Sequence, residues 1–276
     1  MSGLRHLTPG MCEVLGPMLP ALFASGSGPR GGRPAVDDLV CLDAVVDLAR
    51  GTRWRDIRTP SHGVSRDTVL RRLRFRVEAG VLAETMDLPV LRGVLGGALG
   101  LSRISLDSRS IRAEGGSHTG PNPTDRGKPG VKHPLMVERA GTPPACLITP
   151  ANAHDGWFLR PLVQRVARRV GGLAGCKARA DKGYDQPRNG CALAEVAAEG
   201  RIARKKIDAG GLDRRRWVVE RSFGHPCGLH RLERRCERDP WQSTSPSSRS
   251  AASSGSPARS STPVVGTDGV IGVCAR

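Results

Sequence analysis

The stretch Ile104-Ser-Leu-Asp107-Ser-Arg-Ser-Ile-Arg112 is the most informative part of the chain. Apolar and polar residues alternate from Ser102 to Leu106, and this period of two predicts a half-buried β-strand. Asp107 follows directly, so we expect its carboxylate near the end of that strand. The end of a strand is a usual place for a functional site in an α/β sheet.

Two further stretches each carry one carboxylate in a comparable setting. Asp181 begins a Gly-containing turn in Ala180-Asp-Lys-Gly-Tyr-Asp185, and Glu220 lies in a helix-like run, Arg216-Trp-Val-Val-Glu220. Each acid alone is more simply a helix cap or a surface charge. Three carboxylates that meet can hold two divalent metal ions about 4 Å apart, which activate a water and stabilise the leaving oxygen in phosphodiester cleavage. Their order along the chain favours such a site.

The chain is strongly basic. Among 276 residues, 43 Lys and Arg stand against 26 Asp and Glu, which gives a net charge of +17. Arginine predominates, and its guanidinium makes bidentate contacts with phosphate. Phosphate contacts release counterions, so this balance favours nucleic acid over small anions as the partner. A coding sequence rich in G and C would also raise the arginine content, and the two explanations are compatible.

Residues 1–95 are predicted to form a small helical domain. Helices are expected around Pro9 to Leu19, from Val36 to Ala49 and from Arg66 to about Ala79. A turn between two helices, the second of them basic, fits a helix-turn-helix reader of DNA. Its candidate DNA contacts are Arg66, Arg71, Arg72 and Arg74. The alternative is a solvated, charged helix face.

Residues 101–239 are predicted to form one α/β domain. The expected order is three strands, a helix, a strand, a helix, a strand and a helix, which is a layered arrangement. Hydrophobic residues make up 38% and aromatic residues 3%, so the core must consist of Val, Leu, Ile and Ala. The strands are placed at 102–106, 131–137, 144–148, 174–180 and 201–206, the helices at 157–170, 188–199 and 214–223, and a loop at 111–126.

The remaining features concern location and redox state. None of the eight cysteines lies in a C-x-x-C pair and no zinc spacing appears, so we expect reduced thiols in a cytoplasmic protein. Three prolines interrupt the apolar stretch from Leu4 to Leu22, which argues against a signal peptide. No run of eighteen apolar residues predicts a membrane span.

Several segments match one family in a fixed order. They are Ser105-Leu-Asp107, Thr119-Gly-Pro-Asn-Pro-Thr-Asp-Arg-Gly-Lys-Pro-Gly130, Ala151-Asn-Ala-His154-Asp155, Ala180-Asp-Lys-Gly-Tyr-Asp185 and Arg216-Trp-Val-Val-Glu-Arg221. Together they resemble the DDE transposases of bacterial insertion sequences, in the insertion-sequence-five group. The resemblance runs from about residue 4 to about residue 239, and the Gly120 to Gly130 match is its most specific part.

The resemblance implies a ribonuclease-H-like catalytic domain. Asp107, Asp181 and Glu220 would be the DDE triad and would hold two Mg²⁺ ions, with Mn²⁺ as a substitute. The reaction would be hydrolysis at the element's end, followed by attack of the 3′-hydroxyl on target DNA. Arg216 would contact DNA phosphate near the site. Joining two DNA ends implies at least a homodimer on double-stranded DNA.

Other residues in the matching segments are weaker candidates. Lys182 could contact DNA, or be a solvated loop residue, and Tyr184 could do likewise or pack locally. His154 and Asp155 could support the triad from behind, although a loop-stabilising cap is the favoured role for Asp155. His118 and Lys132 follow the same logic, with less support.

The last part of the chain departs from the family pattern. Pro226 cannot sit inside a helix, so the helix that carries Glu220 should stop or kink soon after it. Residues 240–276 are serine-rich and typical of disorder, and a frameshift near codon 239 would explain them. The alternative function is therefore a catalytically decayed remnant that binds terminal-repeat DNA without cutting it. A host nuclease on the same fold is a third hypothesis, which the Gly120 to Gly130 segment argues against.

Overall fold

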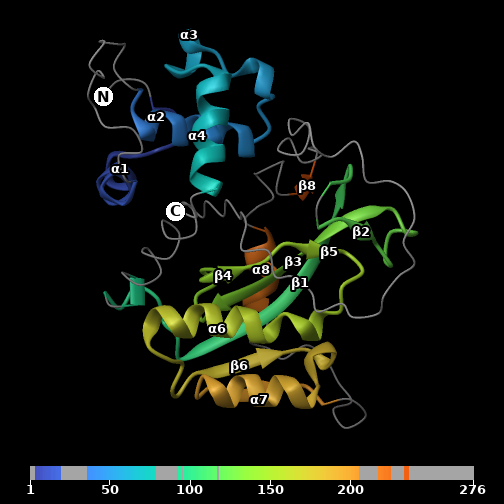
Figure 1. The fold of residues 1–276 in the computed structure, drawn as a ribbon. Coiled ribbons are helices and arrows are strands. Elements are labelled where there is room, and N and C mark those ends of the chain that lie inside the picture. Colours follow the sequence, from blue (N-terminus) through green and yellow to red (C-terminus); the bar gives the residue numbers. More distant parts are fainter. Residues whose placement is uncertain are drawn as a thin grey trace.

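The computed structural model describes residues 4–19, 36–78, 93–94, 96–116, 118–204, 217–224 and 233–235. Its dominant feature is one mixed sheet in which five strands run in the order β2-β3-β1-β6-β7. Figure 1 labels the first four of them. These strands span Gly120–Pro121 (β2), Pro129–Glu138 (β3), Arg103–Ala113 (β1), Lys177–Ala180 (β6) and Glu199–Ile202 (β7). Three short strands complete it within the described residues: β4 (Ala145–Cys146) and β5 (Thr149–Pro150) pair with β3, and β8 (Arg234–Arg235) pairs with β1.

Strand direction divides the sheet at β1. β3 runs antiparallel to β1 along almost its whole length, from Ile104 opposite Glu138 to Arg112 opposite Gly130. On the other side, β6 runs parallel to β1, and β7 runs parallel to β6. The crossovers that parallel strands require contain the helices α6 (Leu159–Val170) and α7 (Pro187–Glu195). The predicted order is therefore confirmed for the longer strands and helices of the described residues, whereas the short strands β2, β5 and β8 were not predicted.

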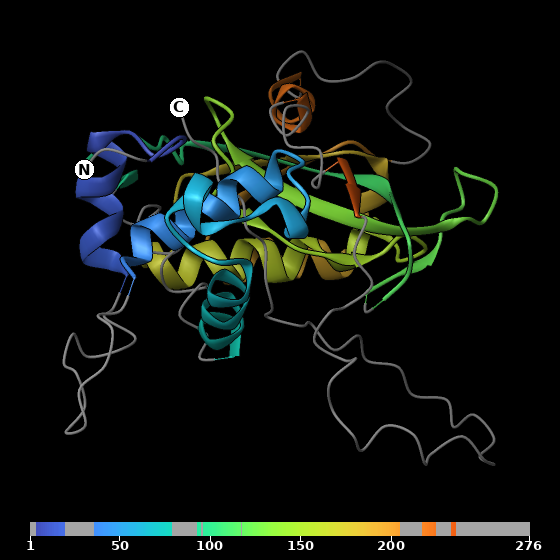
Figure 2. The same cartoon turned by 90° about the horizontal axis from the view of Figure 1, so that it is seen from above.

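The helices lie on two sides of the sheet. Figures 1 and 2 show α6 and α7 on one face and α8 (Trp217–Gly224) on the other. The larger core lies on the α6 side, where Ile104 and Leu106 of β1 pack with Leu162 and Val166 of α6 and Leu193 of α7. A smaller cluster lies on the α8 side and joins Leu135 and Val137 of β3 to Val218 and Val219 of α8.

The N-terminal helices pack through clusters of their own. They are α1 (Pro9–Leu15), α2 (Asp38–Ala49), α3 (Thr59–His62) and α4 (Arg66–Glu78), with short 3-10 turns at Gly16–Met18 (η1) and Trp54–Asp56 (η2). Cys41, Val45, Val64 and Val69 are among the residues that form the core between α2 and α4. Three helices were expected here and are present, whereas α3 was not predicted. The helix-turn-helix interpretation remains a prediction, as do the domain boundaries.

Two carboxylates inside α2, those of Asp43 and Asp47, hold this region together. Asp43 of α2 accepts hydrogen bonds from the backbone N–H groups of Arg5, His6 and Leu7 at 2.8–2.9 Å, and thereby holds the N-terminal segment. Asp47, one turn further along α2, accepts from His6 at 3.0 Å and from His62 at 2.8 Å. Among the described residues, no helix has the length and apolar character needed to cross a membrane.

Two sequence predictions about element ends are wrong. β1 does not stop near Leu106 but continues to Ala113, because β3 pairs with it beyond Asp107. The helix expected to reach Gly200 ends at Glu195, since Ala197 adopts a positive φ of 59° and breaks it. Gly200 lies instead in β7, beside Ala178 of β6.

Several predictions fall on residues outside the described ranges. The proposed break at Pro226 and the serine-rich tail, residues 240–276, lie there, and so does Arg216. The helix that carries Glu220 is described from Trp217 to Gly224 only.

Candidate active site

Asp107 and Asp181 lie at matching positions on neighbouring parallel strands. The last paired residues of β1 and β6 are Ser105 and Arg179, and each aspartate follows two residues later. Neighbouring strands lie about 4.8 Å apart, so the two backbones are adjacent where β6 ends. The expectation that each aspartate follows a strand end is confirmed for Asp181, which comes directly after β6, and is wrong for Asp107, which lies inside β1.

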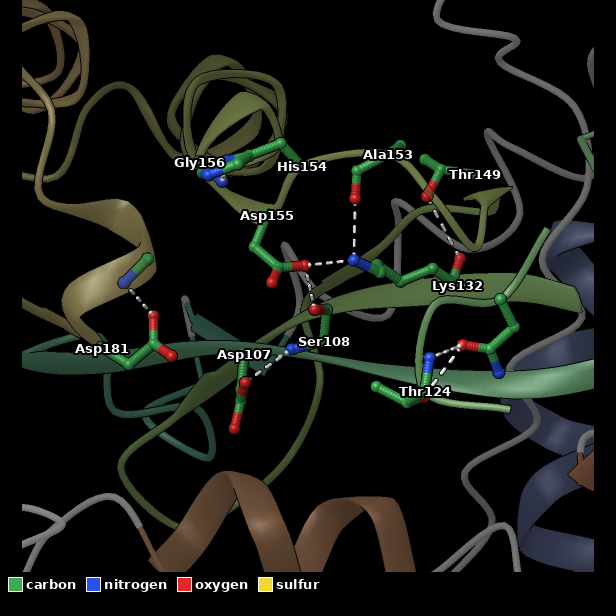
Figure 3. Close-up of polar contacts among 12 residues, drawn as sticks. Asp107, Ser108, Thr124, Lys132, Thr149, Ala153, His154, Asp155, Gly156 and Asp181 are labelled. Carbon is green, nitrogen blue, oxygen red and sulfur yellow. Dashed lines mark hydrogen bonds and ion pairs between the residues drawn. The ribbon is translucent and has the colours of Figure 1, made fainter. Parts of the chain in front are cut away.

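Both aspartates belong to the α8 face of the sheet. Asp107 is opposite Leu135 across the antiparallel pair, and directly opposed residues share one face. Leu135 packs against Val218 and Val219 of α8. In β6, Ala178 and Ala180 face the α6 side, so the alternation of side chains sends Asp181 to the α8 side as well. Figure 3 shows Asp107 directed away from Asp155, which lies on the α6 side.

Backbone N–H groups hold one oxygen of each aspartate. Asp107 Oδ1 accepts from Ser108 N at 2.8 Å, and Asp181 Oδ1 accepts from Gly183 N at 2.9 Å, which caps the 3-10 turn η4 (Lys182–Tyr184). Both side chains are partly buried. An ionised carboxylate offers about four acceptor positions, so one such bond does not by itself prevent it from binding a further ligand.

Glu220 is carried by α8 but lies on its exposed side. Val218, Val219 and Ser222 form the buried side of this helix, and Ser222 donates to the carbonyl of Gly141 at 2.7 Å. Within the described part of the chain, no three His, Cys, Asp or Glu side chains gather closely enough to hold a metal ion. The structure therefore brings Asp107 and Asp181 to one place and puts Glu220 on the helix that covers that face, without closing a three-ligand group.

The residues predicted to contact DNA differ in how exposed their side chains are. Lys182 is exposed in η4, directly after Asp181. On α4, Arg66 and Arg71 are exposed and Arg74 is partly buried. Arg72 is different, because its side chain is 6% exposed and donates to Asp38 of α2.

A buried arginine with an acidic partner offers little surface to a phosphate. Arg72 lies three residues after the buried Val69, on the inner side of α4, and joins this helix to α2. We therefore assign Arg72 a structural role and retain Arg66, Arg71 and Arg74 as candidate contacts. The charge pattern alone could not distinguish them, since its basic residues cover most of the helix.

A second polar group lies behind the two aspartates, on the α6 side. Lys132 of β3 donates to Asp155 Oδ1 at 2.8 Å and to the Ala153 carbonyl at 2.7 Å, and Ser108 also donates to Asp155 (Figure 3). The cap role expected for Asp155 is wrong. His154 caps the 3-10 turn η3 (Asp155–Trp157), since its Nδ1 accepts from Gly156 N at 3.0 Å.

Tyr184 is fully buried beside these groups. Its burial, and then the negative charges of Asp155, Asp107 and Asp181, raise the pKa of its hydroxyl well above the usual value. The hydroxyl makes no hydrogen bond of standard geometry with the described residues. The nearby Ser108 side chain lowers its pKa, but by less than burial and the three carboxylates raise it. Tyr184 therefore stays neutral, and its local packing agrees with the simpler of the two sequence interpretations.

Ser108 is the site residue that the sequence interpretation missed. A serine directly after a candidate metal-binding aspartate gives no signal by itself. Its importance depends on Asp155, which is 47 positions further along the chain. Only the pairing of β1 with β3 and the position of η3 bring the two together.

Comparison with known proteins places this chain in a family. The family model described as a transposase DDE domain matches residues 99–242, more than half of the chain. The protein therefore belongs to the DDE transposase family. Asp107, Asp181 and Glu220 all lie inside the matched range.

One curated relative has the same assignment. The chain is 39% identical over 143 residues to a Burkholderia cepacia protein described as "Putative transposase for insertion sequence element IS402". The match covers 49% of this chain and 66% of that protein, so the chain spans just under two thirds of this relative's length.

Solved structures give a more distant likeness. A piggyBac transposase synaptic complex with hairpin DNA aligns at 12% identity and a TM-score of 0.38, over 71% of this chain and 47% of that one. The Mos1 mariner paired-end complex with Mn aligns at 12% identity and a TM-score of 0.31, over 87% of this chain and 78% of that one. At such scores the likeness supports no further argument.

Proposed function

We propose that this protein is a DNA transposase that cuts and joins strands at the ends of an insertion sequence of the insertion-sequence-five group. One observation carries the proposal: Asp107 and Asp181 occupy matching positions on adjacent parallel strands, on the sheet face covered by the helix of Glu220. Membership of the DDE transposase family supports it independently.

The strand arrangement supports a ribonuclease-H-like catalytic domain. β1 lies between an antiparallel β3 and a parallel β6, and the two crossover helices α6 and α7 share one face. We propose that this domain spans residues 101–239, after a helical DNA-binding domain over residues 1–95. Residues 240–276 would be an out-of-frame tail, and the family match that ends at residue 242 is consistent with this.

The carboxylates fit a hard divalent cation by their chemistry, since Mg²⁺ and Mn²⁺ prefer oxygen ligands. Asp107 and Asp181 would hold two Mg²⁺ ions together with Glu220, with Mn²⁺ as a substitute. When bound, the ions would activate a water or 3′-hydroxyl and stabilise the leaving oxygen. Asp107 and Asp181 supply carboxylate oxygens from neighbouring strands. Glu220 also supplies a carboxylate, but among the described residues it does not come close enough to the two aspartates to form a three-ligand metal site.

The basic side chains would hold the DNA. Lys182 lies beside Asp181 and would contact phosphate near the reacting strand, as would Arg216. Arg66, Arg71 and Arg74 would contact the terminal repeat through α4. We further propose a homodimer on DNA, because two ends must be joined, and a cytoplasmic location, where bacterial DNA lies.

The test is Mg²⁺-dependent cleavage of a DNA fragment that carries the element's own terminus, with a fragment of scrambled terminus beside it. Cleavage confined to the true terminus is the expected result. Binding of the terminus without cleavage would favour the catalytically decayed remnant, which the departure at Pro226 motivates. Cleavage at junctions or RNA hybrids instead of element ends would contradict the transposase and favour a host nuclease.

A further inference from the structure

The Asp155 carboxylate connects three elements behind the candidate active site. Its Oδ1 accepts from Lys132 of β3 and from Ser108 of β1, while Asp155 itself begins η3 (Figure 3). The Lys132 side chain is 13% exposed and that of Asp155 is 35% exposed, so the ion pair is partly shielded from water. A shielded charge-assisted bond holds its partners more firmly than an exposed one.

Ser108 links this ion pair to Asp107. Its hydroxyl donates to Asp155 on the α6 side of the sheet, and its backbone N–H donates to Asp107 Oδ1 on the α8 side at 2.8 Å. Adjacent residues of a strand point to opposite faces, so one residue reaches both groups through the sheet. Fixing the Ser108 side chain therefore fixes the backbone donor that orients the Asp107 carboxylate.

Tyr184 extends the group towards Asp181. Asp181 caps η4, which ends at Tyr184, and Asn189 of α7 donates to the Tyr184 carbonyl at 2.8 Å. The Tyr184 ring is fully buried and its hydroxyl is close enough to Asp155 and both aspartates for their charges to act on it. The two aspartates thus lie on one packed unit, in which Asp155 is a partly exposed anion and Lys132 is its counter-charge.

We infer that Asp155, Lys132 and Ser108 form a positioning network that orients Asp107 for metal binding from the opposite face of the sheet. The inference rests on the proposed function, because it takes Asp107 as a metal ligand. None of the three touches the reacting atoms. Lys132 also balances the charge of Asp155, so the network adds no net negative charge next to the two aspartates.

The experiment measures Mn²⁺ affinity by isothermal titration on the full chain, together with the thermal midpoint and amide hydrogen exchange at residues 105–110. Ser108→Ala removes the link to β1 without leaving a charge unpaired. It should weaken Mn²⁺ binding about tenfold, in the range found when a group behind a metal ligand is removed. Ser108→Thr keeps the hydroxyl and should restore the affinity.

Two further variants complete the test: one removes the Asp155 charge, and the other is a matched control outside the network. Asp155→Asn should weaken Mn²⁺ binding as Ser108→Ala does, and the double variant should be no weaker than the worse single one, because both act through one bond. Glu195→Gln is the matched control, since Glu195 also accepts from a cation, Arg160 at 2.8 Å, and from a neutral donor, Gln164 at 3.1 Å. It should leave Mn²⁺ affinity and exchange at residues 105–110 unchanged.

The outcomes separate the inference from the proposed function. Unchanged Mn²⁺ affinity in Ser108→Ala and Asp155→Asn, with wild-type binding intact, would overturn the network. A fall in the thermal midpoint with no loss of Mn²⁺ affinity would do the same and leave an ordinary stabilising ion pair. If the wild type binds no Mn²⁺, the proposed metal site fails. In that case, faster hydrogen exchange at residues 105–110 in Ser108→Ala and Asp155→Asn, but not in Glu195→Gln, would still support the network. Unchanged exchange in those two variants would refute it.

Discussion

Asp107 and Asp181 reach the same point of the sheet from strands that are 74 positions apart in sequence, because Ser105 and Arg179 are paired two residues before them. The parallel register, and not proximity in the chain, therefore sets the spacing of the two carboxylates. Anything that shifts β6 along β1 by one residue would move Asp181 to the other face, since side chains alternate along a strand.

Arg72 is expected to act on stability and not on DNA. Replacing Arg72 by Met removes its guanidinium from the Asp38 carboxylate, whose side chain is 17% exposed, and breaking one side of a largely buried pair costs about 3 kcal/mol in unfolding free energy. Chemical denaturation measures the loss. Asp67→Asn is the control, because the Arg66–Asp67 pair is exposed and such pairs contribute below about 1 kcal/mol. Equal losses in the two variants would refute the structural role of Arg72.

Arg71 is expected to act on DNA and not on stability. It is exposed on α4, so Arg71→Ala should leave unfolding unchanged and weaken binding to terminal-repeat DNA. The slope of log affinity against log salt should become shallower by about 1, the loss of one phosphate contact. Fluorescence anisotropy over a salt series measures it. An unchanged slope would remove Arg71 from the proposed interface.

His133 makes stability depend on pH. Burial, and then the charges of Arg109 and Arg235, lower the pKa of His133 from 6.5 to about 4. The folded pKa lies below the unfolded value, so the stability is fully present above pH 6.5 and is lost as the pH falls towards 4. At about 1.4 kcal/mol per unit, this loss is on the order of 3 kcal/mol.

Denaturation at several pH values tests this contribution. His133→Phe keeps an aromatic ring without a titratable group, and its stability should fall less than that of the wild type between pH 6.5 and 4. Parallel curves for the two proteins over this range would show that His133 is not the source.

Gly130 is expected to be intolerant of any side chain. A Cβ at this position would lie 2.8 Å from the backbone carbonyl oxygen of Ile111 and 3.2 Å from the Ala151 Cβ. Because backbone atoms cannot move aside cheaply, Gly130→Ala should destabilise by about 1–3 kcal/mol. Gly190→Ala is the contrast, since its Cβ would meet nothing within 4 Å in α7, and it should stabilise by up to about 1 kcal/mol. Similar midpoints for the two variants would contradict this packing.

The sequence predicted the order of the elements because its periodicities are local. The alternation up to Leu106 and the apolar face of α6 are visible in short windows, and both are confirmed. Element ends were less predictable. β1 continues past Asp107 because a partner strand supplies hydrogen bonds there, and α7 ends early because Ala197 takes a left-handed conformation.

The candidate site was predictable only in part. The three carboxylates were found through a resemblance to a family, and two of them lie together in the structure. The burial of Arg72 and the bond from Ser108 to Asp155 were not predictable, because the partners are 34 and 47 positions away in sequence. Such contacts depend on which helices and strands become neighbours, and a charge pattern carries no information about that.

The most direct measurement is Mg²⁺-dependent cleavage of terminal-repeat DNA by the wild type, Asp107→Asn and Asp181→Asn, with DNA binding measured in the same samples. Each substitution keeps the size of the side chain and removes the charge that a divalent cation needs. The account predicts that both variants bind the DNA as the wild type does and cut it only at background level. Full cleavage by either variant would contradict the assignment of these two aspartates to the active site.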